Sequence, residues 1–229
     1  MSVDNGHRRM GCIAGRINLT TLMILTLLLE PKLFTKIPMI NSLYIVGAVF
    51  VFCMVVIRLT HNRIKVDKFF VLILIYRASM FPQTVLLGGE ILDWGYYTLT
   101  LLALVGYFES LEDDKDRLQV IDNTAFLVLL YLSINLLALI TNPAGLIEGL
   151  YFLGYRTRIV EVFVLGVVAS AYVDCWEGGT SFRTLAICII GLIQMVNLWV
   201  ATALVGLGVF AMAYLGLCRL PNLDRKSVV

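Results

Sequence analysis

The sequence predicts an all-α membrane protein, a polytopic transmembrane helix bundle of about eight spans with both termini in the cytoplasm. Two observations predict this class. Hydrophobic residues make up 59% of the chain, and its mean hydropathy is +0.88. Charged residues are concentrated in short clusters between long apolar runs, and the run 185–218 contains no Asp, Glu, Lys or Arg. So much uncharged surface is stable in a bilayer and not in water.

The whole chain, 1–229, is expected to form a single integral membrane domain. A helix needs about 20 apolar residues to cross the hydrocarbon core. Six apolar segments are expected to do so. At about 1.5 Å per residue, the final run 184–218 is long enough for two short spans joined by a reversal between Trp199 and Ala203. The expected spans are 17–33, 40–57, 69–87, 91–108, 122–140, 159–174, 184–200 and 201–218.

The distribution of Lys and Arg predicts the orientation, because cytoplasmic loops are enriched in basic residues. With the N-terminus inside, most basic residues fall in cytoplasmic segments, and only Lys32, Lys36, Arg156 and Arg158 fall outside. Arg77 lies within a span. This asymmetry favours an even number of spans in the inner (cytoplasmic) membrane of a cell.

Several classes of function are excluded or disfavoured. The chain has no Gly-rich phosphate loop, no HExxH and no GxSxG, and its two histidines, His7 and His61, lie in predicted cytoplasmic segments. A His-centred nucleophile at the outer face is therefore excluded. The net charge of +2 does not favour nucleic acid, and no cysteine pair has the CxxC spacing of a zinc site. We therefore expect no metal, no cofactor and no nucleic-acid partner.

Arg77 is the first candidate functional residue. It lies near the middle of the expected span 69–87, where an arginine costs on the order of several kcal/mol unless it faces protein or water. One interpretation is a buried cation that meets an anionic group of a substrate. The other is a structural ion pair with Asp93 or Glu90.

The second candidate site is the external segment 142–158. Arg156 and Arg158 lie there on the side of the membrane where basic residues are disfavoured. The planar guanidinium group of arginine suits phosphate oxygens. Beside these arginines, Tyr151 and Tyr155 offer aromatic faces that can stack on sugar rings. The segment therefore suggests a site for a lipid phosphate or pyrophosphate.

Purely structural roles are also open for the polar residues of this segment and of the expected spans. The two outer arginines could anchor lipid headgroups or pair with Glu148 and Glu161. Asn135, Gln194 and Asn197 lie within expected spans, where hydrogen bonding between helices is their expected role.

Three segments resemble the central part of a known family. They are Tyr-Phe-Leu-Gly-Tyr-Arg-Thr-Arg at 151–158, the short polar loop 174–183, and Asn-Leu-Trp-Val-Ala-Thr-Ala-Leu-Val-Gly-Leu at 197–207. Together they are similar to bacterial O-antigen and capsular polysaccharide polymerases of the O-antigen ligase-like superfamily. Such polymerases commonly carry Phe-Leu-Gly followed by a basic or Asn-containing pair, which corresponds here to Arg156 and Arg158. The resemblance covers about 60 residues.

The resemblance implies an inverting glycosyltransferase that needs no nucleotide sugar, metal or cofactor. It would join polyprenyl-pyrophosphate-linked oligosaccharide units at the outer face of the membrane, beside membrane lipid and other polysaccharide-biosynthesis membrane proteins. Arg156 and Arg158 would be catalytic, stabilising the leaving pyrophosphate. Glu161 is the nearest candidate for a catalytic carboxylate. Arg77, Tyr151 and Tyr155 would bind substrate.

The chain departs from the family in length, because such polymerases usually have ten or more spans and a large external loop in their second half. The chain is therefore expected to be a truncated or partial polymerase, or to share only the architecture. A small membrane transporter or a membrane subunit of a transport complex is the alternative, supported by Arg77, Asn135, Gln194 and Asn197. A non-catalytic scaffold or assembly factor is a second alternative.

Overall fold

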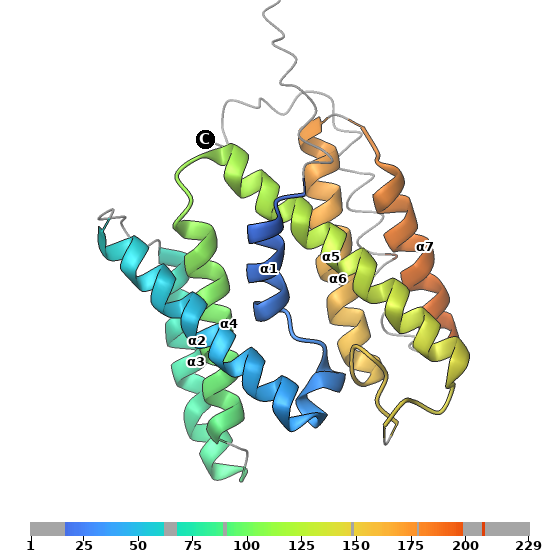
Figure 1. Ribbon diagram of the computed structural model, residues 1–229, viewed down its shortest axis with the longest axis horizontal. Coiled ribbons are helices and arrows are strands. Elements are labelled where there is room, and N and C mark those ends of the chain that lie inside the picture. The colour runs from blue at the N-terminus through green and yellow to red at the C-terminus, as the bar shows by residue number, and fades with distance from the viewer. Residues whose placement is uncertain are drawn as a thin grey trace, which may run out of the picture.

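The computed structural model describes residues 17–61, 68–88, 91–147, 149–177, 179–198 and 208. Within these ranges the chain is helical and has no strand, which confirms the all-α class. Figure 1 shows the arrangement of the helices. In chain order they are α1 (Leu19–Leu28), the 3-10 helix η1 (Lys32–Lys36), α2 (Pro38–His61), α3 (Lys68–Leu86), α4 (Ile91–Glu109), α5 (Asp114–Thr141), α6 (Arg156–Glu177) and α7 (Phe182–Asn197).

Four of these helices are long and apolar enough to cross a membrane: α2, α4, α5 and the Arg158–Glu177 part of α6. The helices Leu19–Leu28, Phe70–Leu86 and Phe182–Asn197 are apolar but shorter. These helices support a membrane protein, whereas the number of eight spans and the orientation stay predictions. The last expected span, 201–218, lies almost entirely outside the described residues.

The first helix is shorter than the expected span 17–33. It begins after Asn18, whose side chain accepts hydrogen bonds from two backbone N–H groups of the first turn, and it ends at Leu28. Ten residues rise only about 15 Å, about half the thickness of the hydrocarbon core. Pro31, which has no N–H to donate, follows, and the chain turns into η1. This break places the half-buried Lys32 at the cavities beside α4 and α6.

The helices form two groups with α1 between them (Figure 1). One group contains α2, α3 and α4, and the other contains α5, α6 and α7. Helix α1 contacts α2 and α4 on one side and α5 on the other. We call the space between the two groups the seam, and the cavities described below lie along it.

Close packing on small residues holds the second group together. A Cβ atom added to Gly191 on α7 would lie 2.0 Å from the ring of Phe163 on α6. A Cβ atom added to Gly166 on α6 would lie 2.4 Å from Val128 on α5. Small residues allow this close approach, and the resulting van der Waals contact is one source of helix association in a bilayer.

A buried polar network also joins α5 to α7. Asn135 Nδ2 donates to Gln194 Oε1 at 2.6 Å, and the Leu153 backbone N–H donates to Asn135 Oδ1 at 2.9 Å. Asn135 and Gln194 are fully buried. The expected hydrogen bonding between helices is therefore confirmed for this pair. Asn197 instead donates within its own helix, to the Ile193 carbonyl at 2.7 Å.

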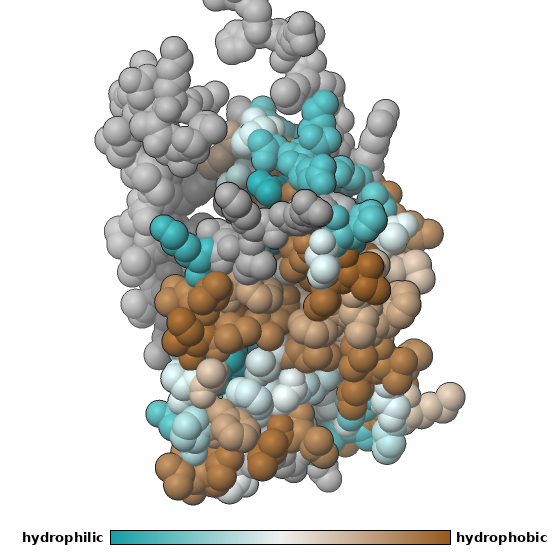
Figure 2. Space-filling view, turned by 90° about the vertical axis from the view of Figure 1, so that its left-hand side faces the viewer, coloured by the Kyte–Doolittle hydropathy of each residue, from teal (hydrophilic) through white to brown (hydrophobic). Residues whose placement is uncertain are grey.

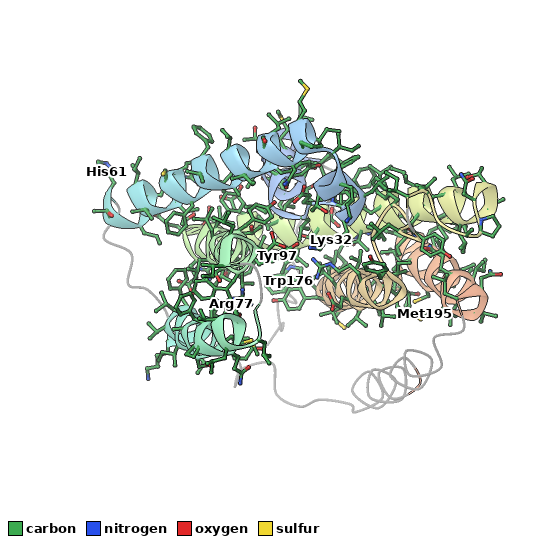
Figure 3. All side chains as sticks on the ribbon, turned by 90° about the horizontal axis from the view of Figure 1, so that it is seen from below. Lys32, His61, Arg77, Tyr97, Trp176 and Met195 are labelled. Atoms are coloured by element: carbon green, nitrogen blue, oxygen red, sulfur yellow. The ribbon has the colours of Figure 1, made fainter. Side chains whose placement is uncertain are left out.

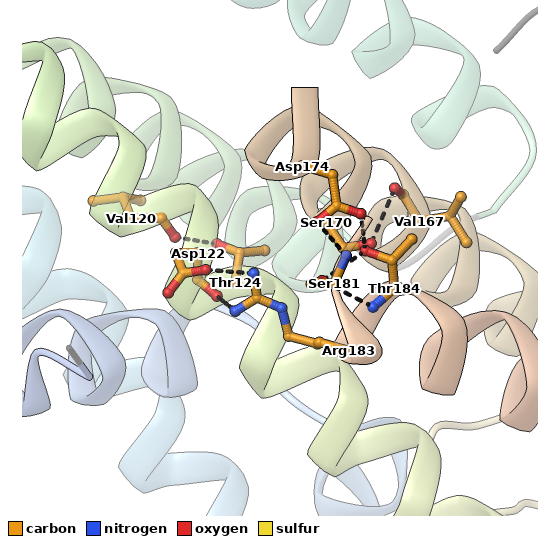
Figure 4. Close-up of polar contacts among 9 residues, drawn as sticks. All are labelled: Val120, Asp122, Thr124, Val167, Ser170, Asp174, Ser181, Arg183 and Thr184. Carbon is orange, nitrogen blue, oxygen red and sulfur yellow. Dashed lines mark hydrogen bonds and ion pairs between the residues drawn. The ribbon is translucent and has the colours of Figure 1, made fainter. Parts of the chain in front are cut away.

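A second polar cluster lies at the α6–α7 turn (Figure 4). Arg183 Nη2 lies 2.5 Å from Asp122 Oδ1, and both side chains are largely buried. Asp174 Oδ2 accepts a hydrogen bond from the Thr184 hydroxyl at 2.6 Å, and its Oδ1 accepts one from the Ser181 N–H at 3.1 Å. These contacts connect α5, α6 and α7 at the end of the second group that lies away from η1.

The surface has the character expected of a protein in lipid. Figure 2 shows a band of hydrophobic side chains across the molecule, with hydrophilic side chains gathered above it. Helices α2 and α3 expose many large apolar side chains, such as Leu43, Phe50, Leu72 and Ile75. Many exposed apolar side chains on neighbouring helices are unfavourable in water, so these side chains are expected to face the acyl chains of lipid.

Candidate functional site

The centre of the candidate site is a cavity of about 310 Å³ in the seam, which we call the cationic pocket. Its walls come from both helix groups and from the segment between α1 and α2. Figure 3 shows Lys32, Tyr97 and Arg77 converging between the two groups. The polar side chains of its lining are Glu30, Lys32, Arg77, Tyr96, Tyr97, Thr100 and Arg158.

Arg77 reaches the pocket from α3. Its Nε donates to the Thr98 hydroxyl at 3.0 Å, and its Nη2 donates to the Trp94 carbonyl at 3.3 Å. The guanidinium group also lies 5.8 Å from the centre of the Trp94 ring, within cation–π range. Asp93 does not pair with it, and Glu90 lies outside the described residues. Neutral groups of α4 thus hold Arg77 in place, and among the described residues no carboxylate forms an ion pair with it.

Lys32 stands on the opposite wall, at the first position of η1. Its Nζ lies 3.9 Å from the centre of the Tyr97 ring. Its stem is pressed against the loop before α6, because a Cβ atom added to Gly154 would lie 2.8 Å from Lys32 Cβ. Gly154 has a φ of +119°, a conformation that L side chains rarely adopt. The loop glycine therefore allows Lys32 and α6 to approach closely.

Glu30 is the carboxylate of the pocket. Its Oε2 accepts a hydrogen bond from the Tyr96 hydroxyl at 2.7 Å, and its Oε1 is buried without a hydrogen-bond partner. Glu30 and Lys32 lie between α1 and α2, outside the four helices long enough to span. Burial raises the pKa of the Glu30 carboxyl, and burial, together with the charge of Arg158, lowers the pKa of the Lys32 ammonium. Both charges are thus poorly solvated.

Arg158 completes the set of cations from the first turn of α6. It pairs with Glu161 one helical turn later, and both side chains are partly exposed. Arg158 also lines the two cavities beside the pocket. Of the described residues that line the cationic pocket, Lys32, Arg77 and Arg158 are cations and Glu30 is the one carboxylate. Glu161 pairs with Arg158, and Asp93 lies close enough to raise the pKa of Lys32 against the effect of burial. Poorly solvated cations at a cavity favour an anionic ligand.

The remaining predicted site residues occupy different positions. Tyr155 is exposed and lines an outer cavity of about 650 Å³ together with Lys32 and Arg158. Tyr151 is only 4% exposed, and its hydroxyl donates to the Pro143 carbonyl at 2.8 Å. Its ring therefore stabilises the loop. The side chain of Arg156, the first residue of α6, lies outside what the structure describes.

The structure thus brings together four predicted site residues at the pocket and the cavities beside it: Arg77, Arg158, Glu161 and Tyr155. It also adds Lys32 and Glu30, which sequence reasoning missed. A signal existed for Lys32, a basic residue on the expected outer side beside a carboxylate and a proline. Tyr96 and Tyr97 carried no signal, because only tertiary packing shows which face of α4 meets the seam.

Comparison with known proteins identifies no relative: no family model, no curated protein and no solved structure matches the chain.

Proposed function

We propose that the chain is a polysaccharide polymerase-like membrane protein that acts on lipid-pyrophosphate-linked oligosaccharides at the outer face of the membrane. It would act alone or as one part of a larger polymerase. One observation carries the proposal: Arg77 and Arg158, both singled out in the sequence, line a single cavity with Lys32. A diphosphate has the charge and the oxygens that such a set of donors binds.

The chemistry in this proposal is a displacement at the anomeric carbon of the donor sugar. A hydroxyl of the acceptor saccharide attacks this carbon, and the bond to the diphosphate oxygen breaks. The polyprenyl diphosphate leaves with the bonding electron pair, and the pocket cations stabilise the developing negative charge. Glu161, beside Arg158, is the proposed acceptor of the hydroxyl proton. Tyr155 in the outer cavity is placed to contact sugar.

The test is the length of the polymer in cells that make a capsule or O-antigen with this protein. Arg77→Ala, Arg156→Ala and Arg158→Ala are expected to shorten or abolish the polymer at normal protein levels. Arg58→Ala is the matched control, because Arg58 is an exposed cation in the last turn of α2 and lines none of the four cavities described along the helix groups. Unchanged polymer in all three of these arginine variants would overturn the proposal.

A second candidate function is a small transporter of an anionic amphiphile or a membrane subunit of a transport complex. The observation that favours it is the row of cavities along the seam, from the outer cavity through the cationic pocket to an apolar cavity between α4 and α6. In proteoliposomes, a transporter would move labelled lipid diphosphate between leaflets without an acceptor sugar. Polymer formation without such movement would favour the polymerase.

A further inference from the structure

A further cavity along the seam is mainly apolar. It has a volume of about 670 Å³ and lies between α4 and α6, with α5 at its back. We call it the apolar crevice. Its walls include Phe108 of α4 and Val168, Ala169 and Tyr172 of α6. Its volume lies within the usual range of small-molecule sites, about 300–1,000 Å³.

The apolar crevice adjoins the cationic pocket. Leu29 and Leu104 line both cavities, so the apolar walls begin where the charged walls end. The crevice extends away from η1 towards the α4–α5 turn, where Glu109 and Arg117 form its polar margin. The two cavities together form one amphipathic site with a cationic end and an apolar body.

We propose that the apolar crevice holds the hydrocarbon chain of the lipid whose diphosphate binds in the cationic pocket. The inference rests on the proposed function for the nature of the head group. Charge complementarity identifies the occupant: the cations fix an anionic head beside Leu29 and Leu104, and a chain attached to that head enters the apolar walls beyond them. The ligand is thus a long-chain lipid diphosphate bound through both of its parts.

The crevice is expected to contribute through close packing rather than through the hydrophobic effect. A chain that leaves the bilayer for the crevice exchanges one apolar environment for another, so little free energy comes from dehydration. The gain comes from van der Waals contact and from the tether to the bound head. We therefore expect filling of the crevice to weaken lipid binding about tenfold rather than to abolish it.

Two valines of α6 provide a matched pair of variants. Val168 lines the crevice and is 47% exposed, whereas Val164 is 49% exposed and lines none of the four cavities. The experiment measures the binding of polyprenyl diphosphate and of inorganic pyrophosphate to the full chain in nanodiscs. Val168→Trp is expected to weaken binding of the lipid about tenfold and to leave pyrophosphate unchanged. Val164→Trp is expected to change neither.

The outcomes separate the crevice from the head-group proposal. If Val168→Trp leaves lipid binding unchanged, or weakens both ligands equally, the inference is overturned. If Arg77→Ala weakens neither ligand while Val168→Trp still weakens the lipid, the inference stands and the proposed role of the pocket fails. A folding defect is recognised by circular dichroism, and Leu165→Trp at another crevice position then repeats the test.

Photocrosslinking identifies the occupant directly. Tyr172 lines the crevice, and Tyr172→p-benzoylphenylalanine replaces one aromatic ring by a reactive one. Irradiation in the presence of polyprenyl diphosphate is expected to give a lipid adduct that excess phosphatidylglycerol does not displace. A crosslink to residues 199–229 instead would show that the chain's own C-terminal segment fills the crevice. Loss of the polyprenyl diphosphate adduct when phosphatidylglycerol is added would show that ordinary membrane lipid occupies the crevice. Either of these two results overturns the inference.

Discussion

Arg77 on α3 and Arg158 on α6 line the same cavity, although their helices belong to different groups that meet only along the seam. Lys32, on the segment that follows the short helix α1, lines the same cavity. A site that draws its cations from both groups depends on how the groups sit together. Binding of an anion there is therefore expected to stabilise the whole bundle and not one helix alone.

Arg77→Lys is expected to lose most of the function of Arg77 although it keeps the charge. The guanidinium group donates to the Thr98 hydroxyl and the Trp94 carbonyl at once and lies over the Trp94 ring. An ammonium group cannot reproduce this planar arrangement. Titration with inorganic pyrophosphate is expected to show affinity close to that of Arg77→Ala. Affinity close to wild type would mean that charge alone matters at this position.

Gly191→Ala is expected to destabilise the bundle by about 1–3 kcal/mol, because the added methyl group would overlap the Phe163 ring. Gly95→Ala on α4 is the control, since nothing lies within 4 Å of its added Cβ atom. That variant is expected to stabilise slightly, by about 0.5–1 kcal/mol, through lower backbone entropy of the unfolded chain. Unfolding in mixed micelles measures the free energy of unfolding of both variants. A change of the same sign in the two variants would contradict the close approach of α6 and α7.

Asn135→Leu is expected to cost about 1–3 kcal/mol, because it leaves Gln194 Oε1 and the Leu153 N–H unpaired in the interior. The double variant with Gln194→Leu is expected to cost less than the sum of the single variants. A coupling of about 0.6–1.7 kcal/mol is typical of such pairs in membranes. Strict additivity in the same unfolding assay would show that the two side chains do not interact.

Asp122→Ala is expected to destabilise the bundle strongly, although Asp122 does not line the cationic pocket. It leaves the largely buried Arg183 without its partner, which costs about 3–5 kcal/mol (Figure 4). Replacing both residues by leucine is expected to recover much of this loss. The exposed pair Arg117–Asp114 serves as the control, where Asp114→Ala is expected to cost less than about 1 kcal/mol. Similar losses at both pairs in the unfolding assay would contradict the burial of Arg183.

Composition and charge clustering sufficed to predict an all-helical membrane protein, because both follow directly from the solvent that the chain must occupy. Arg77 and Arg158 could be found as candidates because, in the expected topology, each departs from the usual placement of charge in membrane proteins. Their convergence could not be predicted, since helix order does not determine which faces meet. Of the two alternative ion-pair partners of Arg77, Asp93 does not pair with it, and Glu90 lies outside the described residues; Nε and Nη2 donate instead to the Thr98 hydroxyl and the Trp94 carbonyl.

The break after α1 is the other instructive difference. Hydropathy alone extended the first span to residue 33, although Glu30, Pro31 and Lys32 interrupt it. Hydropathy averaged over a window hides a short polar interruption. The helix nevertheless ends there, because Pro31 has no N–H with which to continue the helical hydrogen bonds. The interruption supplies the pocket with a carboxylate and a cation. Polar residues that interrupt the end of an expected span should therefore be considered candidate functional residues, as a charge in the middle of a span is.

The most direct test of the account is a double-mutant cycle on anion binding. Pyrophosphate affinity is measured in nanodiscs for the wild type, Arg77→Ala, Arg158→Ala and the double variant, with Arg58→Ala as control. If both arginines hold one anion, each single change weakens binding about 10- to 100-fold, the two effects are not additive, and the control changes nothing. Affinities that are equal in all five proteins would contradict the cationic pocket as the functional site.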